Sequence, residues 1–225
     1  MKFCHDLFRA NFKYSDYRDF TLGRNTISRI IHDSFIKDSL PLLSGNILEL
    51  GASYQRDYSQ YATNAKTYTK SNSEAGGNVE LEIDARRMEL EDNSYDGIVC
   101  LNVLEHIEDF KSVFKEIFRV LKPRGTLILT VPFVYYYHAA PDDYYRFTVS
   151  ALRENLSNYA ELKILSIGNK WSNLAHCLQG PDWIKGRRVY ASMPLRILGL
   201  AFLLNSLRYE LPDNYSLEHG VIAVK

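Results

Sequence analysis

The sequence has few cysteines, no excess of charge and no long apolar run. Its three cysteines, Cys4, Cys100 and Cys177, lie far apart and include no C-x-x-C pair, which argues against a disulfide framework or a thiolate zinc site. Lysine plus arginine and aspartate plus glutamate both number 27, so net charge gives no attraction for nucleic acid. The first residues lack the apolar core of a secretory signal, and no apolar run reaches the ~20 residues that span a bilayer. We therefore expect a cytoplasmic protein that does not bind nucleic acid.

Apolar residues make up 46% of the chain and fall in two kinds of pattern. Helical spacing predicts a helix that begins near Asn25 or Thr26 and ends at Pro41, and a second over 108–122 that a stop signal at 122–125 ends. A third is predicted from a Thr148 cap to about Asn158. Because strands alternate with helices, parallel βαβ units are favoured. The predicted fold is α/β, a doubly wound, mostly parallel, seven-stranded sheet. Its strands are expected at 46–51, 65–72, 79–83, 95–101, 126–131, 162–167 and 221–224.

We predict a single domain, 1–225, in four parts: an N-terminal helical extension (1–44), a cofactor-binding core (45–170), a helical insertion (171–213) and a last strand (214–225). Within the insertion, residues 193–208 are apolar nearly all round. A buried helix or the contact surface of a homodimer are the favoured interpretations. Contact with a membrane surface is disfavoured, because one arginine at each end is little basic charge for an interfacial helix.

Ligands of open parallel sheets bind outside the carboxyl ends of the strands. At these ends we expect Gly51, Asn72, Asp84, Asn102 and Pro132. A ligand lying across them would meet backbone amides at Gly51, a polar side chain for ribose hydroxyls at Asn72, and a carboxylate for a base amino group at Asp84. This arrangement suits adenosine.

Six short segments occur in an order typical of one enzyme family. They are Ile-Leu-Glu-Leu-Gly (47–51), Asp-Ala (84–85), Ser-Tyr-Asp-Gly-Ile-Val-Cys (94–100), Val-Leu-Glu-His (103–106), Leu-Lys-Pro-Arg-Gly (121–125) and Leu-Thr-Val-Pro-Phe (129–133). Together they resemble the class I S-adenosylmethionine-dependent methyltransferases over roughly residues 44–168. The segment 138–148 resembles a subgroup associated with polysaccharide and cell-surface glycan biosynthesis. The resemblance implies a Rossmann-like methyltransferase fold, S-adenosylmethionine as cofactor, and a sugar, glycan or other small-molecule acceptor.

The resemblance also implies which residues contact the cofactor. The first motif faces its methionine part, Asn72 stands where the family has a ribose-binding acid, and Asp84 matches the residue that contacts the adenine amino group. Leu101 and Asn102 match the segment that lines the sulfonium. The cofactor-binding residues implied in this way are Glu49, Gly51, Ala52, Ser53, Asn72, Asp84, Ala85, Leu101 and Asn102.

Three residues after the strand 126–131 are the predicted catalytic set. His138 is the candidate base, since an ordinary histidine pKa of about 6.5 suits neutral pH. Asp143 would orient it or bind a sugar hydroxyl, and Arg146 would pair with an acceptor phosphate or carboxylate. The alternatives are a loop-stabilising hydrogen bond at His138 and an internal ion pair between Asp143 and Arg146. No metal site is predicted, because the pair 105–106 has no further ligand cluster beside it in the sequence.

The leading prediction is thus an O-methyltransferase acting on a sugar or a small hydroxylated metabolite. The first motif keeps one glycine, Gly51, where the family has two or three, so a catalytically silent methyltransferase-like binding protein is an alternative. An oxidoreductase or nucleotide-sugar enzyme is a third hypothesis, disfavoured because no G-x-G-x-x-G is present.

Overall fold

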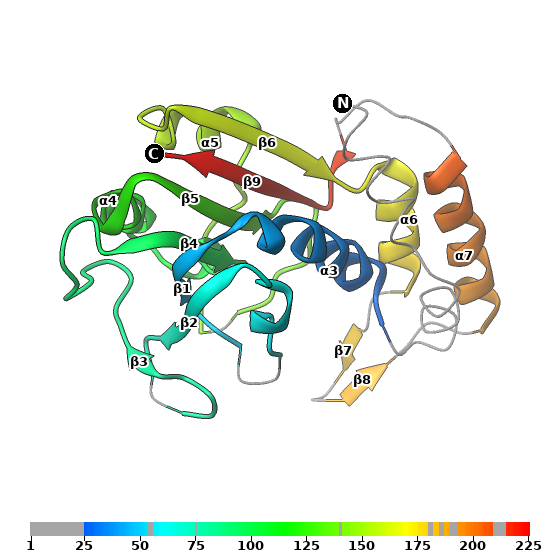
Figure 1. The fold of residues 1–225 in the computed structure, drawn as a ribbon. Coiled ribbons are helices and arrows are strands. Elements are labelled where there is room, and N and C mark those ends of the chain that lie inside the picture. The colour runs from blue at the N-terminus through cyan, green and yellow to red at the C-terminus, as the bar shows by residue number, and fades with distance from the viewer. Residues whose placement is uncertain are drawn as a thin grey trace. The chain divides into compact units, whose positions relative to one another are not determined.

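A computed structural model of the chain describes residues 25–53, 56–74, 76–139, 141–179, 182–184, 187–189, 193–208 and 215–225 (Figure 1). The chain divides into two compact units. One, here the sheet unit, is Ile36–Leu165 with His219–Lys225. The other, here the second unit, is Met1–Phe35 with Ser166–Glu218. The predicted catalytic and cofactor-binding residues all lie in the sheet unit.

A seven-stranded sheet has the order β3-β2-β1-β4-β5-β9-β6. The pairs from β3 to β5 are parallel, whereas β9 runs opposite to its neighbour β6 (Figure 1). This confirms the predicted mostly parallel α/β sheet. The chain moves outward from β1 in one direction and from β4 in the other, so the topological switch point lies between these two strands. The strands are β1 (Gly45–Leu50), β2 (Ala65–Asn72), β3 (Leu81–Glu82), β4 (Tyr95–Leu101), β5 (Leu121–Pro132), β6 (Glu161–Ile167) and β9 (Glu218–Val224).

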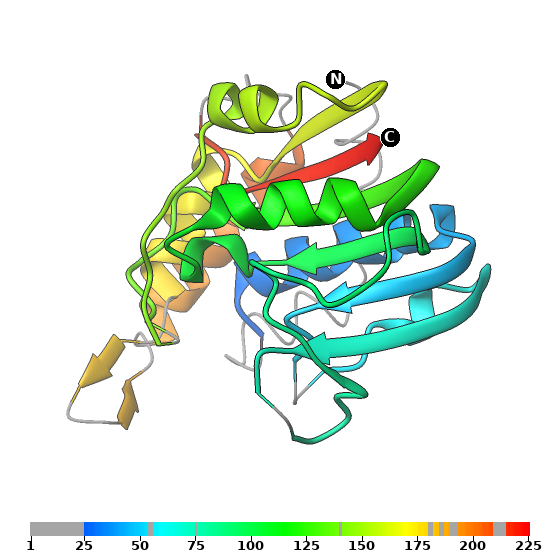
Figure 2. The ribbon, with the colours of Figure 1, turned by 90° about the vertical axis from the view of Figure 1, so that its left-hand side faces the viewer.

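The central strands are apolar on both faces, as expected for parallel strands with covered faces. Leu48 of β1 pairs with Thr69 of β2 and with Ile98 of β4. Figure 2 shows α4 (Phe110–Val120) lying along one face of the sheet. Residues from α4 and from α5 (Val149–Asn155) pack in one core cluster with the strands, among them Val113, Phe114, Ile117 and Leu152 beside Leu48, Ile98 and Leu129.

Two helices of the sheet unit begin at capping side chains. The Asp109 carboxylate accepts a hydrogen bond from the Ser112 backbone N–H at 3.2 Å, and the Thr148 hydroxyl accepts one from Ala151 at 3.2 Å. The predicted Thr148 cap is confirmed. Two short 3-10 turns, η2 (Ser59–Tyr61) and η3 (Leu104–His106), follow β1 and β4, and η3 carries two residues of the candidate site.

The sheet differs from the prediction at two places. The strand expected at 79–83 contains only Leu81 and Glu82. The chain farther along is held to α4, where the Arg119 guanidinium donates to the Met88 and Leu90 carbonyls. The residues 122–125, expected to end a helix, are part of β5. They bulge opposite Asp96, since Tyr95 pairs with Leu121 and Gly97 with Thr126.

The second unit contains most of α3 (Ile27–Ser39), which the short 3-10 turn η1 (Leu40–Leu42) extends. It also contains α6 (Lys170–Gln179) and α7 (Met193–Arg208), so the insertion is helical as predicted, with an unpredicted hairpin of β7 (Asp182–Ile184) and β8 (Arg187–Val189). Trp171 of α6 stacks on Phe202 of α7 with ring centroids 5.6 Å apart. Within the parts of the chain that the structure describes, no helix is both long and apolar enough to cross a membrane. The predicted extension 1–44 is described only from residue 25 onward.

The apolar segment 193–208 forms α7, as its composition predicts. Four of its aliphatic side chains are partly exposed, so a helix buried all round does not fit; they are Leu195, Ile197, Leu198 and Leu204. The interpretations as a homodimer surface and as a membrane-facing surface stay predictions.

Candidate functional site

The carboxyl ends of β1, β4 and β5 meet at one edge of the sheet, because the three strands are parallel neighbours. The turn 51–53 leaves this edge from β1, and η3 follows β4 closely. The loop after β5 carries His138, Asp143 and Arg146. The switch point therefore collects the predicted cofactor turn and the predicted catalytic loop.

The turn after β1 requires its single glycine. Gly51 has φ +68°, and a Cβ atom there would overlap a methyl group of Val103, in the segment after β4. Glu49, two residues earlier, is buried, and burial raises the pKa of its carboxyl group to about 7. The neighbouring Tyr68 hydroxyl and Lys70 ammonium oppose that rise in the pKa. The turn thus brings a carboxyl group that ionises near neutral pH close to the switch point.

Asn72 and Ala52 hold each other in place. The Asn72 side-chain N–H donates to the Ala52 carbonyl at 3.0 Å, and the Ala52 backbone N–H donates to the Ser71 carbonyl at 2.8 Å. The Asn72 side-chain oxygen accepts from the Ser73 backbone at 2.7 Å and from the Ser73 hydroxyl at 3.3 Å. One N–H of the Asn72 amide remains for a ribose hydroxyl.

Asp84 forms an ion pair with Arg86 two residues later. The Arg86 Nε lies 2.9 Å from one carboxylate oxygen and Nη2 lies 2.7 Å from the other. This pairing lowers the pKa of Asp84 below its usual range. A carboxylate offers about four acceptor positions, so an adenine amino group can share it with the guanidinium.

The remaining predicted cofactor residues are anchored by the strands beside them. Asn102, with φ +53°, accepts a hydrogen bond from the Thr130 hydroxyl at 3.0 Å through its side chain, and its backbone N–H donates to the Thr130 carbonyl at 3.0 Å. Leu101 ends β4, and Ala85 packs against the core cluster. Ala52 is buried and Ser53 is exposed.

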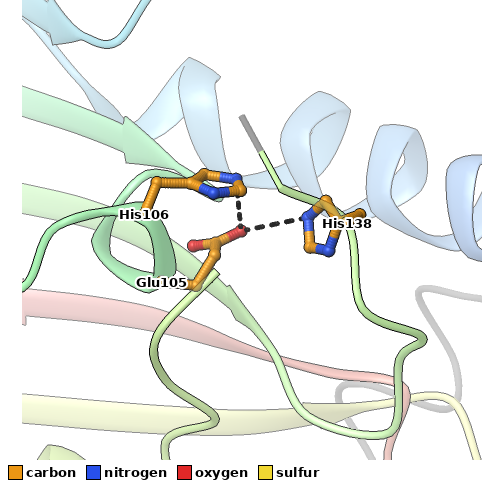
Figure 3. A group of neighbouring side chains, drawn as sticks. All are labelled: Glu105, His106 and His138. Carbon is orange, nitrogen blue, oxygen red and sulfur yellow. Dashed lines mark ion pairs between the residues drawn. The ribbon is translucent and has the colours of Figure 1, made fainter. Parts of the chain in front are cut away.

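Three side chains converge beside the end of β4, as Figure 3 shows. One carboxylate oxygen of Glu105 lies 3.7 Å from His106 Nε2 and 3.8 Å from His138 Nε2. Glu105 is fully buried, and the two imidazole rings meet edge to face with centroids 5.0 Å apart. The sequence argument against a metal rested on the missing third ligand beside Glu105 and His106. The fold supplies one in His138, which no local sequence signal indicates.

The outer nitrogen of each imidazole faces an oxygen. His106 Nδ1 lies 2.6 Å from the Asp142 carbonyl oxygen. His138 Nδ1 lies 3.3 Å from the Tyr136 carbonyl oxygen, its hydrogen-bond partner, and 3.2 Å from an Asp143 carboxylate oxygen. We assign the Nδ1–H tautomer to both rings, because each Nδ1 then donates to its oxygen. Each Nε2 consequently directs a lone pair toward Glu105.

Asp143 and Arg146 form the internal ion pair that was the alternative interpretation. The Arg146 Nη2 donates to an Asp143 carboxylate oxygen at 2.7 Å, and this guanidinium holds the pKa of Asp143 at about 2. Arg146 also donates to the Tyr136 carbonyl at 3.1 Å, and the His138 backbone N–H donates to Asp143 at 2.9 Å. The Asp143 side chain is 1% exposed and lies 3.2 Å from His138 Nδ1, so we infer that it helps to orient that ring. The predicted direct contact between Arg146 and the acceptor stays a prediction. Burial lowers the pKa of His138, while Asp143 acts in the opposite direction.

Tyrosines surround the catalytic loop. Tyr135 and Tyr136 stack with ring centroids 4.4 Å apart. Tyr136, Tyr137 and Tyr144 are exposed, and the Tyr144 hydroxyl donates to the Asp142 carboxylate at 3.1 Å. These rings offer aromatic surface beside the cluster of Glu105, His106 and His138.

Comparison with known proteins identifies the core of the chain. Residues 44–129 match the methyltransferase domain family. This segment runs from β1 into β5, makes up less than half of the chain, and is similar to a methyltransferase domain. The sterol 24-C-methyltransferase of Aspergillus fumigatus is 45% identical over 42 residues, which are 19% of this chain and 11% of that protein.

Solved methyltransferase structures share the fold. A methyltransferase of Archaeoglobus fulgidus matches with a TM-score of 0.58 and 12% identity, over 95% of this chain and 100% of that one. Phosphoethanolamine N-methyltransferase 2 of Haemonchus contortus, in complex with S-adenosylmethionine, matches with a TM-score of 0.54 and 16% identity over 86% of this chain. This chain spans 52% of the length of the nematode enzyme. The predicted Rossmann-like methyltransferase fold is confirmed.

The methyltransferase domain uses S-adenosylmethionine, and the residues at the switch point fit it. Glu49 places a buried carboxyl group where the family binds the cationic methionine part, and Gly51 gives the turn its left-handed conformation. Asp84 keeps acceptor capacity for the adenine amino group. The roles of the individual residues stay predictions.

We predict that cofactor binding releases protons from Glu49. Its pKa of about 7 leaves it partly protonated at neutral pH, and a nearby cationic ligand lowers that pKa by favouring the carboxylate. Calorimetry at pH 7 in buffers of different ionisation enthalpy should show release of less than one proton per chain. The release should shrink at pH 8.5, where Glu49 is already ionised, and disappear in Glu49→Gln. Equal proton release in wild type and Glu49→Gln would exclude this role.

Proposed function

We propose that this methyltransferase transfers a methyl group to a hydroxyl oxygen of a small molecule, and that the acceptor is a sugar or a glycan precursor. The observation that carries the proposal is the convergence of Glu105, His106 and His138 at the carboxyl end of β4. This cluster follows Leu101 and Asn102 directly, and the family lines the sulfonium with that segment. Groups that remove a proton from an acceptor hydroxyl are expected at this position.

The chain's own residues would position and activate the acceptor. S-adenosylmethionine, when bound, supplies an electrophilic methyl group on a sulfonium. Asp143 and the Tyr136 carbonyl fix the ring of His138, so that its Nε2 is directed toward Glu105, where we place the acceptor hydroxyl. Holding the hydroxyl in line lowers the barrier by reducing the orientational freedom that is lost in the transition state.

The tyrosines support a sugar-like acceptor. Tyr136, Tyr137 and Tyr144 combine exposed ring faces with polar hydroxyl groups. Such side chains suit a ligand that has both apolar C–H faces and hydroxyl groups, as a sugar ring does. The resemblance of the segment 138–148 to a glycan-related subgroup agrees with this class of acceptor, and we place the activity in polysaccharide biosynthesis in the cytoplasm.

One observation favours a second candidate, a catalytically silent methyltransferase-like binding protein. Asp84 is paired with Arg86, and the Asn72 amide is bonded to Ala52. If these contacts persist, two of the expected cofactor contacts are weakened. A silent protein would not bind S-adenosylmethionine, so cofactor binding separates the two candidates.

We predict saturable binding of S-adenosylmethionine and S-adenosylhomocysteine in calorimetric titration, with no heat from nicotinamide cofactors. Asp84→Ala should weaken binding about 10- to 100-fold, because a hydrogen bond to a charged group is lost. The matched control Glu80→Ala removes an exposed carboxylate from the same region and should bind as the wild type does. Absence of heat from both adenosyl ligands would favour the silent candidate.

We predict that His138→Gln lowers methyl transfer to sugar acceptors about 100- to 10,000-fold, the range for loss of a general acid–base group. Its affinity for S-adenosylmethionine should stay within a few-fold of wild type. Rates are measured from S-adenosylhomocysteine formation across a panel of sugars and nucleotide-sugars. A full transfer rate in His138→Gln would rule out any role of this imidazole in the transfer.

A further inference from the structure

The cluster of Glu105, His106 and His138 has the geometry of an ion site. Its three ligand atoms all lie within 4.8 Å of one another, and the carboxylate oxygen is 3.7 and 3.8 Å from the two Nε2 atoms. These separations are longer than hydrogen bonds. Around a tetrahedral ion with bonds of about 2.1 Å, ligand atoms lie about 3.4 Å apart. The two histidine nitrogens, which lie within 4.8 Å of each other, would have to approach by up to about 1.4 Å, so side-chain movements of about an ångström would close the cluster around an ion.

Both imidazoles are oriented as metal-binding histidines usually are. A ligating imidazole donates its other ring N–H to a carbonyl or carboxylate oxygen, which fixes the tautomer and the ring. The Nδ1 atom of His106 bonds to the Asp142 carbonyl in this way, and that of His138 bonds to the Tyr136 carbonyl, with Asp143 beside it. The lone pairs of both Nε2 atoms then face the Glu105 carboxylate, and a cation between them makes this arrangement favourable.

The charges around the cluster also favour a cation. Glu105 is fully buried, and a buried carboxylate is stabilised when a positive charge lies beside it. Arg146 is nearby, but its guanidinium is paired with Asp143, so these two charges offset each other. A divalent ion bound between Glu105 and the two imidazoles adds a positive charge beside this carboxylate.

We propose that Glu105, His106 and His138 bind one divalent transition-metal ion of the Zn²⁺, Co²⁺ or Mn²⁺ class. Two imidazole nitrogens and one carboxylate oxygen suit these ions, whereas Mg²⁺ and Ca²⁺ prefer oxygen ligands. Three protein ligands leave at least one position open for water or substrate, as in catalytic metal sites.

The role of the ion rests on the proposed function. A hydroxyl group bound at the open position has a lowered pKa, because the ion stabilises its deprotonated form. His138 then contributes as a ligand of the ion, and the acceptor proton passes to water. Metal binding itself does not depend on the identity of the acceptor.

Metal binding can be measured on the full chain, stripped with a chelator and dialysed against Zn²⁺, Co²⁺ or Mn²⁺ alone, with Mg²⁺ as the control ion. We expect one Zn²⁺ or Co²⁺ per chain by elemental analysis and little bound Mg²⁺. The visible spectrum of bound Co²⁺ should indicate nitrogen and oxygen ligands without thiolate. The proposal would be overturned if none of the three ions Zn²⁺, Co²⁺ and Mn²⁺ bound stoichiometrically.

Single variants test the ligand set. Glu105→Gln, His106→Gln and His138→Gln should each weaken Zn²⁺ binding at least ~100-fold. Asp143→Asn changes a residue that supports His138 without being a ligand, and should weaken binding about 10- to 100-fold. The control variant Cys177→Ser removes an exposed cysteine outside the cluster and should bind Zn²⁺ as wild type does. Unchanged affinity in the three ligand variants would place the ion elsewhere and refute the site.

Two further measurements distinguish loss of the metal site from misfolding and from failure of the proposed function. Zn²⁺ should raise the thermal unfolding midpoint of wild type but not of His106→Gln, since only a folded protein with the site gains stability from the ion. S-adenosylmethionine titration of the same samples reports on the cofactor site. Cofactor binding without metal binding overturns the metal site alone, and metal binding without cofactor binding overturns the proposed function alone.

Discussion

The candidate site depends on the parallel pairing of β1, β4 and β5. Parallel strands need covered faces, and the buried apolar residues of β1 and β4 meet that requirement, with α4 along one side of the sheet. Because the three strands point the same way, their carboxyl ends meet at one edge. Segments that are far apart in the sequence, the turn at Gly51, the turn η3 and the loop of His138, are brought together by this pairing.

A second constraint fixes the chemistry at that edge. The bidentate contact between Arg146 and Asp143 holds the loop after β5 in one conformation, and Asp143 in turn orients the ring of His138. The carbonyl of Asp142 does the same for His106. Neither contact needs the acceptor, so the cluster around Glu105 is preorganised, as a site that activates a hydroxyl group should be.

Much of the fold could be predicted from the sequence, because local patterns decide it. The predicted bounds of the strands 65–72 and 95–101 coincide with β2 and β4, and Thr148 caps α5. Local patterns predicted the wrong structure where hydrogen bonding between segments far apart in the sequence decides it. The segment 122–125 reads as a helix stop, yet its backbone pairs with the last strand, as Arg124 donates to the Lys225 carbonyl and Lys225 donates to Gly125.

The candidate site was predictable residue by residue but not as a group. The family motifs pointed to Gly51, Asp84 and His138, whereas the pairing of Asp84 with Arg86 and the approach of His138 to Glu105 depend on side-chain positions in the fold. The absence of a third ligand near Glu105 and His106 in the sequence therefore gave no information about the space around them.

The central claim is that the cofactor and the cluster share one site at the switch point. A crystal structure of the full chain with S-adenosylhomocysteine tests it most directly. The account predicts the adenine at Asp84, the homocysteine end at Glu49 and Gly51, and the sulfur facing Glu105, His106 and His138. A ligand bound with its sulfur directed away from these three side chains would contradict it.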